Sequence, residues 1–295
     1  MVILPTEETS EFKGIANLDF LVSKVTQLIS LPDIYYRLET AIESPTSNVQ
    51  EFARLLGSDP DLCARLLRVA NSAFYSFPAK IETIERAVTT IGLRQIRELV
   101  LVTSVMKIFN QLPAGGLNMK LFWEHSIAVG VLAKSIARYA GLAQSERFYI
   151  PGLLHDIGRL VMHIKMPNLM QELMLQHRRQ GELLHILELQ HLSYSHAEIG
   201  GRLLEFWNVP ESICEPVYNH HYPDKSHEFA AATCAVHMAD IWVNRHQTGS
   251  TEEQRESHFD PETTRLLGIQ EYEMEELWAI TRDEINDVTR RFAAH

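Results

Sequence analysis

Apolar residues recur at helical spacing along almost the whole chain, and no stretch shows the regular alternation of apolar and polar residues expected of strands. The pattern predicts one helix over VSKVTQLIS, stopped near Pro32, and a second over NVQEFARLL, ending at Gly57. Asp59 and Pro60 then have the residue types of an N-cap and a first helical turn. These features predict an all-α protein.

Two segments interrupt the helical pattern. The segment QLPAGGLN, with its break from Pro113 to Asn118, is the strongest internal boundary. The polar stretch NRHQTGSTEEQRESHFDPE indicates a linker or exposed loop, and helical spacing then resumes with Leu277 and Trp278 as candidate packing residues. We therefore expect an N-terminal helical lobe, a second helical lobe and a helical tail, over residues 1–115, 116–250 and 251–295.

The 295-residue chain has a formal net charge of −11, which disfavours nucleic acid and anionic lipid as bulk partners. It starts without the basic region of a secretory signal, and its longest apolar stretches are too short to cross a bilayer. Cys63, Cys214 and Cys234 form no C-x-x-C pair, which argues against a disulfide scaffold and suits a reducing compartment. We therefore expect a cytoplasmic protein without nucleic-acid or membrane partners.

Two aspartates lie where water should be excluded. His155 and Asp156 are adjacent in the apolar run GLLHDIGRL, and Asp240 lies in CAVHMADIWV. A buried carboxylate without a partner costs several kcal/mol or stays protonated. Arg159 is the only basic residue close to Asp156 in the sequence. Both aspartates therefore need a nearby cation, and a divalent metal would supply it.

Four further histidines lie on apolar faces of the predicted helices, namely His125, His196 and the adjacent His220 and His221. A single histidine in that position is most often a core residue bonded to a carbonyl group. Five histidines and two aspartates facing inward on helices of one bundle instead indicate a shared metal site. Nitrogen and oxygen donors without thiolate favour iron, manganese, zinc, cobalt or nickel over calcium or magnesium alone.

The other carboxylates and histidines give weaker signals. Glu188 precedes His196 by two helical turns and is a candidate for orienting it, although a solvated helix face is at least as good an explanation. Seven histidines share no constellation, and we interpret them as surface or ordinary packing residues: His163, His177, His185, His191, His227, His237 and His246. Among these, His237 lies near Asp240.

The order of the candidate ligands resembles that in the HD superfamily of metal-dependent phosphohydrolases. His125, His155–Asp156 and Asp240 match its single histidine, His-Asp pair and distant aspartate, and His196 and His220–His221 match the additional ligands of its binuclear members. The upstream segments SDPDLCARLLRVANSAFYSF and IETIERAVTTIGLRQIRELVL narrow the resemblance to the HDOD family, the HD-related output domain of bacterial signalling proteins. The similarity extends roughly from residue 20 to residue 245.

The resemblance implies an upstream helical lobe, an HD-like helical bundle and a role in signal transduction. It implies that Asp156 bridges two metal ions, the first held with His125, His155 and Asp240 and the second with His196, His220 and His221. We therefore expect one or two divalent ions, with iron, manganese or zinc favoured. Asp156 and Arg159 are the candidate catalytic residues, with Arg159 either facing a phosphate or simply solvated.

Two functions remain open on these grounds. The first is a signalling output module with a protein partner on the upstream lobe, where Phe74, Tyr75 and Phe77 either contact that partner or fill the core. The second is a metal-dependent phosphohydrolase with a nucleotide or phosphate ligand. Cyclic-di-GMP hydrolysis is disfavoured, because only Tyr222–Pro223 remains of the Gly-Tyr-Pro motif of those enzymes and Arg159 replaces their lysine.

Overall fold

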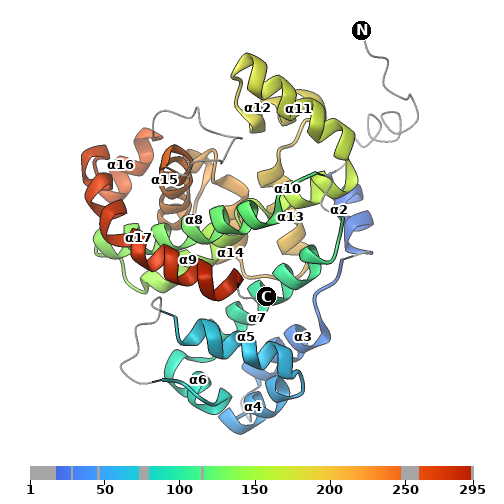
Figure 1. Ribbon diagram of the computed structural model, residues 1–295, viewed down its shortest axis with the longest axis vertical. Helices are drawn as coiled ribbons and strands as arrows, with labels where there is room; N and C mark the ends of the chain where they lie inside the picture. The colour runs from blue at the N-terminus through green and yellow to red at the C-terminus, as the bar shows by residue number, and fades with distance from the viewer. Residues whose placement is uncertain are drawn as a thin grey trace. The chain divides into compact units, whose positions relative to one another are not determined.

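A computed structural model describes residues 18–27, 29–44, 47–72, 80–113, 116–246 and 259–293. Most of the described residues lie in helices, and none of them lies in a strand (Figure 1). The all-α prediction is therefore confirmed. None of the described helices is both long and apolar enough to cross a membrane. The three cysteines are free, and Cys214 and Cys234 are buried.

The chain divides into two compact units. The larger unit comprises the described residues within 1–29 and 113–277, and the smaller unit comprises those within 30–112 and 278–295. The N-terminal helix α2 (Leu18–Thr26) groups with the larger unit because it packs on α13 (His196–Phe206). The C-terminal helix α17 (Glu271–Ala293) contributes residues to both units.

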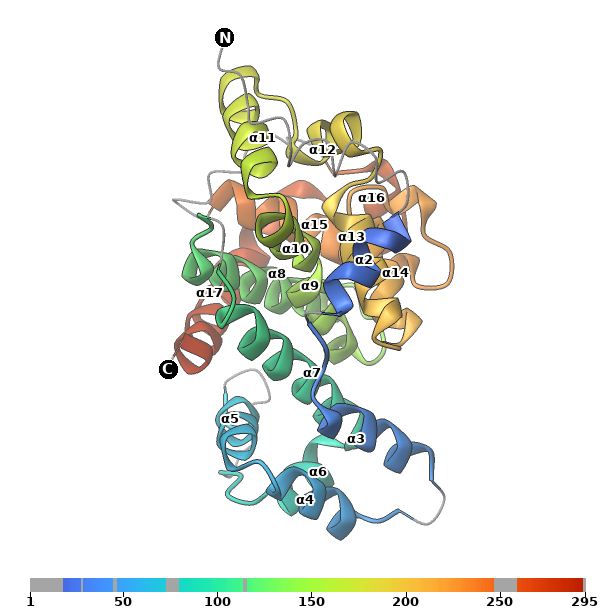
Figure 2. The ribbon, with the colours of Figure 1, turned by 90° about the vertical axis from the view of Figure 1, so that its right-hand side faces the viewer.

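The smaller unit is built from short amphipathic helices. Its remaining helices are α3 (Asp33–Glu43), α4 (Val49–Gly57), α5 (Pro60–Ala70), α6 (Ile84–Ile91) and α7 (Leu93–Asn110). Helix α4 ends at Gly57 as predicted, and Asp59 caps α5 by accepting a hydrogen bond from the Leu62 N–H group at 3.0 Å. Helix α4 packs against α6, and α5 packs against α7 (Figure 2). Their shared core includes the fully buried Leu56 and Leu66.

The larger unit surrounds one central helix, α8 (Met119–Tyr139), which packs against α9 (Tyr149–Leu154) and α15 (Ala230–His246). Its other elements are α10 (Ile157–Lys165), α11 (Pro167–Gln180), α12 (Leu184–Leu192), α14 (Glu211–Asn219), α16 (Pro261–Leu267) and the short 3₁₀ turns η1 (Ser145–Phe148) and η2 (Pro223–Lys225).

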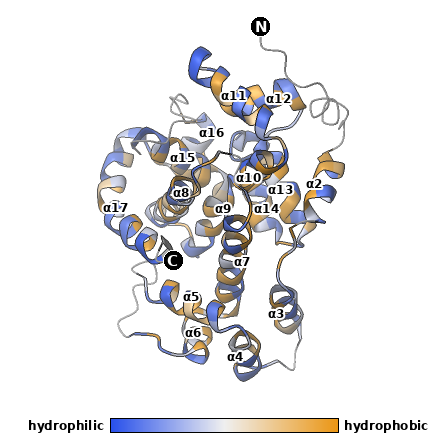
Figure 3. Ribbon diagram, turned by 45° about the vertical axis from the view of Figure 1, so that its right-hand side comes forward, coloured by the Kyte–Doolittle hydropathy of each residue, from blue (hydrophilic) through white to orange (hydrophobic). Residues whose placement is uncertain are grey.

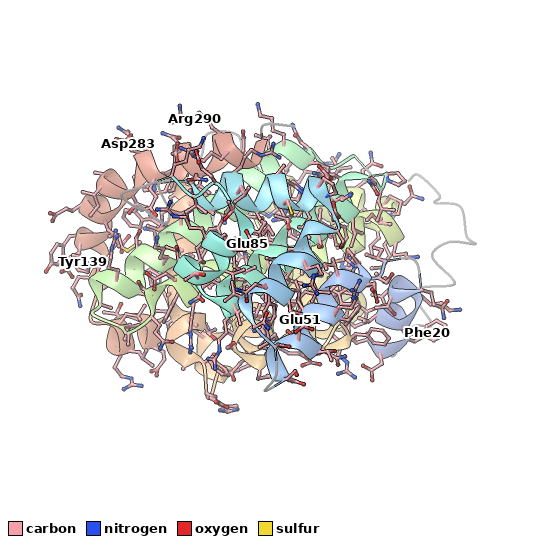
Figure 4. The ribbon with its side chains drawn as sticks, turned by 90° about the horizontal axis from the view of Figure 1, so that it is seen from below. Phe20, Glu51, Glu85, Tyr139, Asp283 and Arg290 are labelled. Atoms are coloured by element: carbon pink, nitrogen blue, oxygen red, sulfur yellow. The ribbon has the colours of Figure 1, made fainter. Side chains whose placement is uncertain are left out.

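Outer helices such as α11 and α17 alternate hydrophobic and hydrophilic positions (Figure 3). Side chains such as Phe20 and Tyr139 are exposed on their helices (Figure 4).

Glycines allow two helix pairs of the larger unit to approach closely. A Cβ atom on Gly158 of α10 would lie 1.9 Å from the backbone oxygen of His196 and 2.7 Å from the backbone nitrogen of Gly200, both in α13. A Cβ atom on Gly152 of α9 would lie 2.8 Å from the Cα atom of Gly130 in α8. Only residues without a side chain fit at these crossings. The contacts bring the starts of α10 and α13 together, where three of the candidate ligands lie, namely His155, Asp156 and His196.

Candidate metal centre

The seven candidate ligands come from five places in the larger unit. They are His125 in α8, His155 and Asp156 at the junction of α9 and α10, His196 at the start of α13, His220 and His221 directly after α14, and Asp240 in α15. All seven are buried, with exposed fractions between 0 and 7%. Ionisable groups withdrawn from water to this degree need compensating charges or hydrogen bonds.

One group of donor atoms gathers around Asp240. Its Oδ1 atom lies 3.0 Å from Nε2 of His125 and 3.5 Å from Nε2 of His155. Ligand atoms of these three residues all lie within 4.8 Å of one another. Asn244, one turn further along α15, donates a hydrogen bond to the same Asp240 oxygen at 3.0 Å and so fixes the carboxylate.

A second group gathers around His196. Its Nε2 atom lies 3.0 Å from Nε2 of His221, and ligand atoms of His196, His220 and His221 lie within 4.8 Å of one another. Asp156 lies between the two groups. Its Oδ1 atom is 3.2 Å from Nε2 of His196, whereas its Oδ2 atom is 3.5 Å from Nε2 of His155. The two oxygens of one carboxylate therefore face different groups of donors.

Three of the imidazoles are oriented by hydrogen bonds from Nδ1. His155 donates to the Gly152 carbonyl at 2.7 Å, and His220 donates to the Val217 carbonyl at 2.8 Å. His196 donates to Oε2 of Glu188 at 2.7 Å. When Nδ1 carries the proton of a neutral imidazole, Nε2 presents a lone pair. The structure thus turns three potential ligand atoms towards the cluster.

Glu188 is fully buried in α12, so it does not lie on a solvated helix face. The same Oε2 atom that accepts the bond from the His196 ring also accepts the backbone N–H of His196 at 2.8 Å. The carboxylate thus binds both the side chain and the main chain of this histidine. This arrangement is typical of a carboxylate that orients a metal ligand without binding the metal itself.

Charge is distributed unevenly among the imidazoles. Burial opposes protonation of His155, but the carboxylates of Asp156 and Asp240 outweigh it and raise the pKa of this imidazole to about 9. Burial also opposes protonation of His196, yet Glu188 and Asp156 raise its pKa well above the usual value. For His220, burial and the neighbouring His155 and His196 lower the pKa well below the usual range.

The residues fit a cation. Nε2 of His155, Nε2 of His220 and Oδ1 of Asp156 are buried, and within the described part of the chain these atoms form no hydrogen bond. Leaving several buried polar atoms unsatisfied is costly. A divalent ion on each side of Asp156 would satisfy them, and nitrogen and oxygen donors suit iron, manganese or zinc.

Arg159 lies beside the cluster and is not solvated. It is 6% exposed, and its Nη1 atom donates a hydrogen bond to Oδ2 of Asp156 at 2.9 Å. Although burial favours the neutral acid, His155 and Arg159 lower the pKa of Asp156 well below its usual value. Arg159 therefore helps to keep the central carboxylate ionised, and its contact with a phosphate stays a prediction.

Two of the seven histidines interpreted as surface or ordinary packing residues, His185 and His237, contact the candidate ligands. The His185 ring stacks on that of His221 with ring centroids 3.9 Å apart, and burial together with His196 lowers the pKa of His185 to about 3. His237 donates from Nδ1 to the His220 carbonyl at 2.7 Å. Both follow a helical spacing, since His185 lies three residues before Glu188 and His237 three before Asp240. That spacing was the available signal.

Comparison with known proteins agrees with this architecture. The sequence model of the HDOD domain matches residues 28–223, more than half of the chain. An uncharacterised protein of Treponema pallidum (strain Nichols) is 25% identical over 225 residues, which are 76% of this chain and 43% of that protein. The chain thus spans less than half the length of this curated relative.

Two solved structures share the fold. The crystal structure of an HDOD domain protein of unknown function from Geobacter sulfurreducens has a TM-score of 0.73 and 24% identity, covering 94% of this chain and 97% of that one. The crystal structure of a candidate phosphohydrolase from Shewanella amazonensis SB2B has a TM-score of 0.69 and 23% identity, covering 95% and 100%. Together with the match of the family sequence, these findings show that the chain belongs to the HDOD family.

Proposed function

We propose that the chain is a signalling output protein whose larger unit holds a binuclear centre of divalent metal ions. One ion would be held by His125, His155, Asp156 and Asp240, and the other by Asp156, His196, His220 and His221. The observation that carries the proposal is the position of Asp156, whose two carboxylate oxygens lie 3.5 Å from His155 and 3.2 Å from His196, respectively. A single carboxylate between two groups of nitrogen donors is suited to bridging two ions.

The neighbouring residues prepare the donors for binding. Glu188 holds the proton of His196 on Nδ1, and the Gly152 and Val217 carbonyls do the same for His155 and His220. His155 and Arg159 lower the pKa of Asp156 and so keep it ionised. A divalent ion bound there supplies a Lewis acid that neutralises phosphate oxygens and makes water a better nucleophile.

The match to the HDOD family supports the signalling role, because the resemblance implies an output domain of signalling proteins. All seven donor side chains are at most 7% exposed, so ions held by them would also stabilise the surrounding helices. We infer that the ions stabilise the larger unit or respond to a ligand, and that a signalling protein reads the resulting state. Phe74, Tyr75 and Phe77, the candidate contact residues for such a partner, lie outside the described residues.

A metal-dependent phosphohydrolase acting on a nucleotide or cyclic nucleotide is the second candidate. The complete set of seven donor residues favours it, as does the structural similarity to the Shewanella protein named as a candidate phosphohydrolase. Arg159 would then stand next to the bridging carboxylate as a candidate phosphate contact.

One experiment separates the two functions. The protein is purified anaerobically, its metal content is measured, and the same sample is assayed with a generic phosphodiester and a panel of nucleotides. Bound metal without turnover supports the signalling role. Turnover that is lost in an Asp156→Ala variant establishes the hydrolase instead. A protein that binds no metal would contradict both proposals.

A further inference from the structure

The smaller unit contains a cavity of about 340 Å³. None of the residues that line it is a candidate metal ligand. Side chains from three separate helices line it, namely α5, α7 and the last turns of α17. Four of the lining residues are basic: Arg65, Arg68, Lys107 and Arg291. Asp61 is the one acidic residue among those that line the cavity.

This concentration of positive charge is unusual for a chain with a formal net charge of −11. The existing ion pairs neutralise only part of this positive charge. Asp61 pairs with Arg65 at 2.9 Å and with Lys107 at 3.4 Å, so a single carboxylate serves two cations. Arg291 pairs through Nε with Asp287 of its own helix at 2.8 Å, which leaves its two terminal guanidinium nitrogens for a ligand. Arg68 lies one helical turn after Arg65, and within the described residues it forms no ion pair. The cavity therefore carries uncompensated positive charge, which attracts anions.

The rest of the lining is suited to an organic body attached to the anion. Val69 and Met106 provide apolar surface, and Asn110 and Gln111 provide amide groups. A cavity of about 340 Å³ lies within the usual range for small-molecule sites. Arginine is the preferred side chain for binding phosphate, because its planar guanidinium offers several donors.

We propose that this cavity binds a small phosphate-bearing molecule of the size of a nucleoside monophosphate. The phosphate contacts Arg68, Arg291 and Lys107, and the organic part lies against Val69 and Met106. The site belongs to the smaller unit, so its ligand binds without any metal ion. It would give an HDOD protein a small-molecule input in addition to its candidate metal centre.

Isothermal titration calorimetry on the full-length, chelator-treated protein tests this inference. The probes are adenosine monophosphate, inorganic phosphate and adenosine. Adenosine monophosphate should bind more tightly than either of the other two. Arg68→Ala and Arg291→Ala should each weaken its binding by about tenfold, which is the loss expected for one charge-assisted hydrogen bond. Binding should also weaken as the salt concentration rises.

Two control variants define the outcome. Arg54→Ala removes an exposed arginine of α4 that does not line the cavity, and it should leave the affinity unchanged. Asp156→Ala disrupts the candidate metal centre and should also bind the nucleotide normally. The proposal is overturned if none of the probes binds, if Arg68→Ala binds as well as Arg54→Ala, or if binding is lost in Asp156→Ala instead. Far-ultraviolet circular dichroism verifies that each variant is folded.

Discussion

Glu188 and His196 form a fully buried pair in which one carboxylate oxygen accepts hydrogen bonds from both the imidazole Nδ1, at 2.7 Å, and the backbone nitrogen, at 2.8 Å. The first bond fixes which ring nitrogen carries the proton, and the second fixes the position of the first turn of α13. Nε2 of His196 is therefore directed at Asp156 by a residue that does not itself reach the candidate metal position.

Replacing Glu188 by glutamine should weaken metal binding without removing a ligand. The amide keeps the shape of the side chain but loses the charge that holds the His196 proton on Nδ1. Loss of such a partner typically costs about 10- to 100-fold in metal affinity. Competition with a chromophoric chelator measures the change. Glu182→Gln, at an exposed position just before α12, is the matched control and should bind metal normally. Equal affinities in the two variants would rule out the orienting role.

The stability of the metal-free protein should be greatest near pH 6.5. The raised pKa of His155, about 9, means that its protonated form stabilises the fold fully below pH 6.5, and that this contribution is lost as the pH rises towards 9. His185 has a lowered pKa of about 3, so its contribution is lost as the pH falls below 6.5. Each change of stability with pH follows from whether the folded or the unfolded state binds more protons at that pH.

Thermal unfolding across this pH range, with and without added manganese or zinc, tests that expectation. In the presence of metal the loss of stability between pH 6.5 and about 9 should disappear, since the ion takes the place of the proton on His155. A metal-free protein that becomes more stable between these pH values would show that the histidine is neutral there and that the charge balance of the cluster is different.

Gly158→Ala should destabilise the larger unit strongly. The added Cβ atom would lie 1.9 Å from the His196 carbonyl oxygen, and backbone on both sides leaves little room for adjustment. Overpacking of this kind costs about 1–3 kcal/mol or more. Gly57→Ala is the control, because no atom lies within 4 Å of its added Cβ atom, and it should be neutral or slightly stabilising. Denaturant unfolding compares the two, and similar stabilities would show that α10 and α13 pack less closely.

Local signals in the sequence predicted much of the fold and most of the cluster. Asp59 caps α5, as its position before Pro60 predicts, because caps depend on residues only a few positions apart. The seven candidate ligands stood out since each places a polar group on an apolar helix face. Side chains on these faces come together when the faces pack into one core.

The remaining features depend on contacts between distant segments. Periodicity cannot show that α2 packs on α13, because the two helices are far apart in the sequence. It also cannot show that Arg68 and Arg291 line one cavity, since more than two hundred residues separate them. The burial of Arg159 depends likewise on packing around the Asp156 carboxylate. From the sequence alone, charged side chains at such positions are interpreted as solvent-exposed, and only the packing shows that they line a cavity or are buried.

The most direct test of the account is the metal content of the wild-type protein and of Asp156→Ala, both purified anaerobically and measured by inductively coupled plasma mass spectrometry. The wild type should contain one or two equivalents of iron, manganese or zinc per chain, and the variant should lose most of it, because the carboxylate between the two groups of histidines is gone. Unchanged metal in a folded Asp156→Ala variant, or no metal in the wild type, would contradict the proposed binuclear centre.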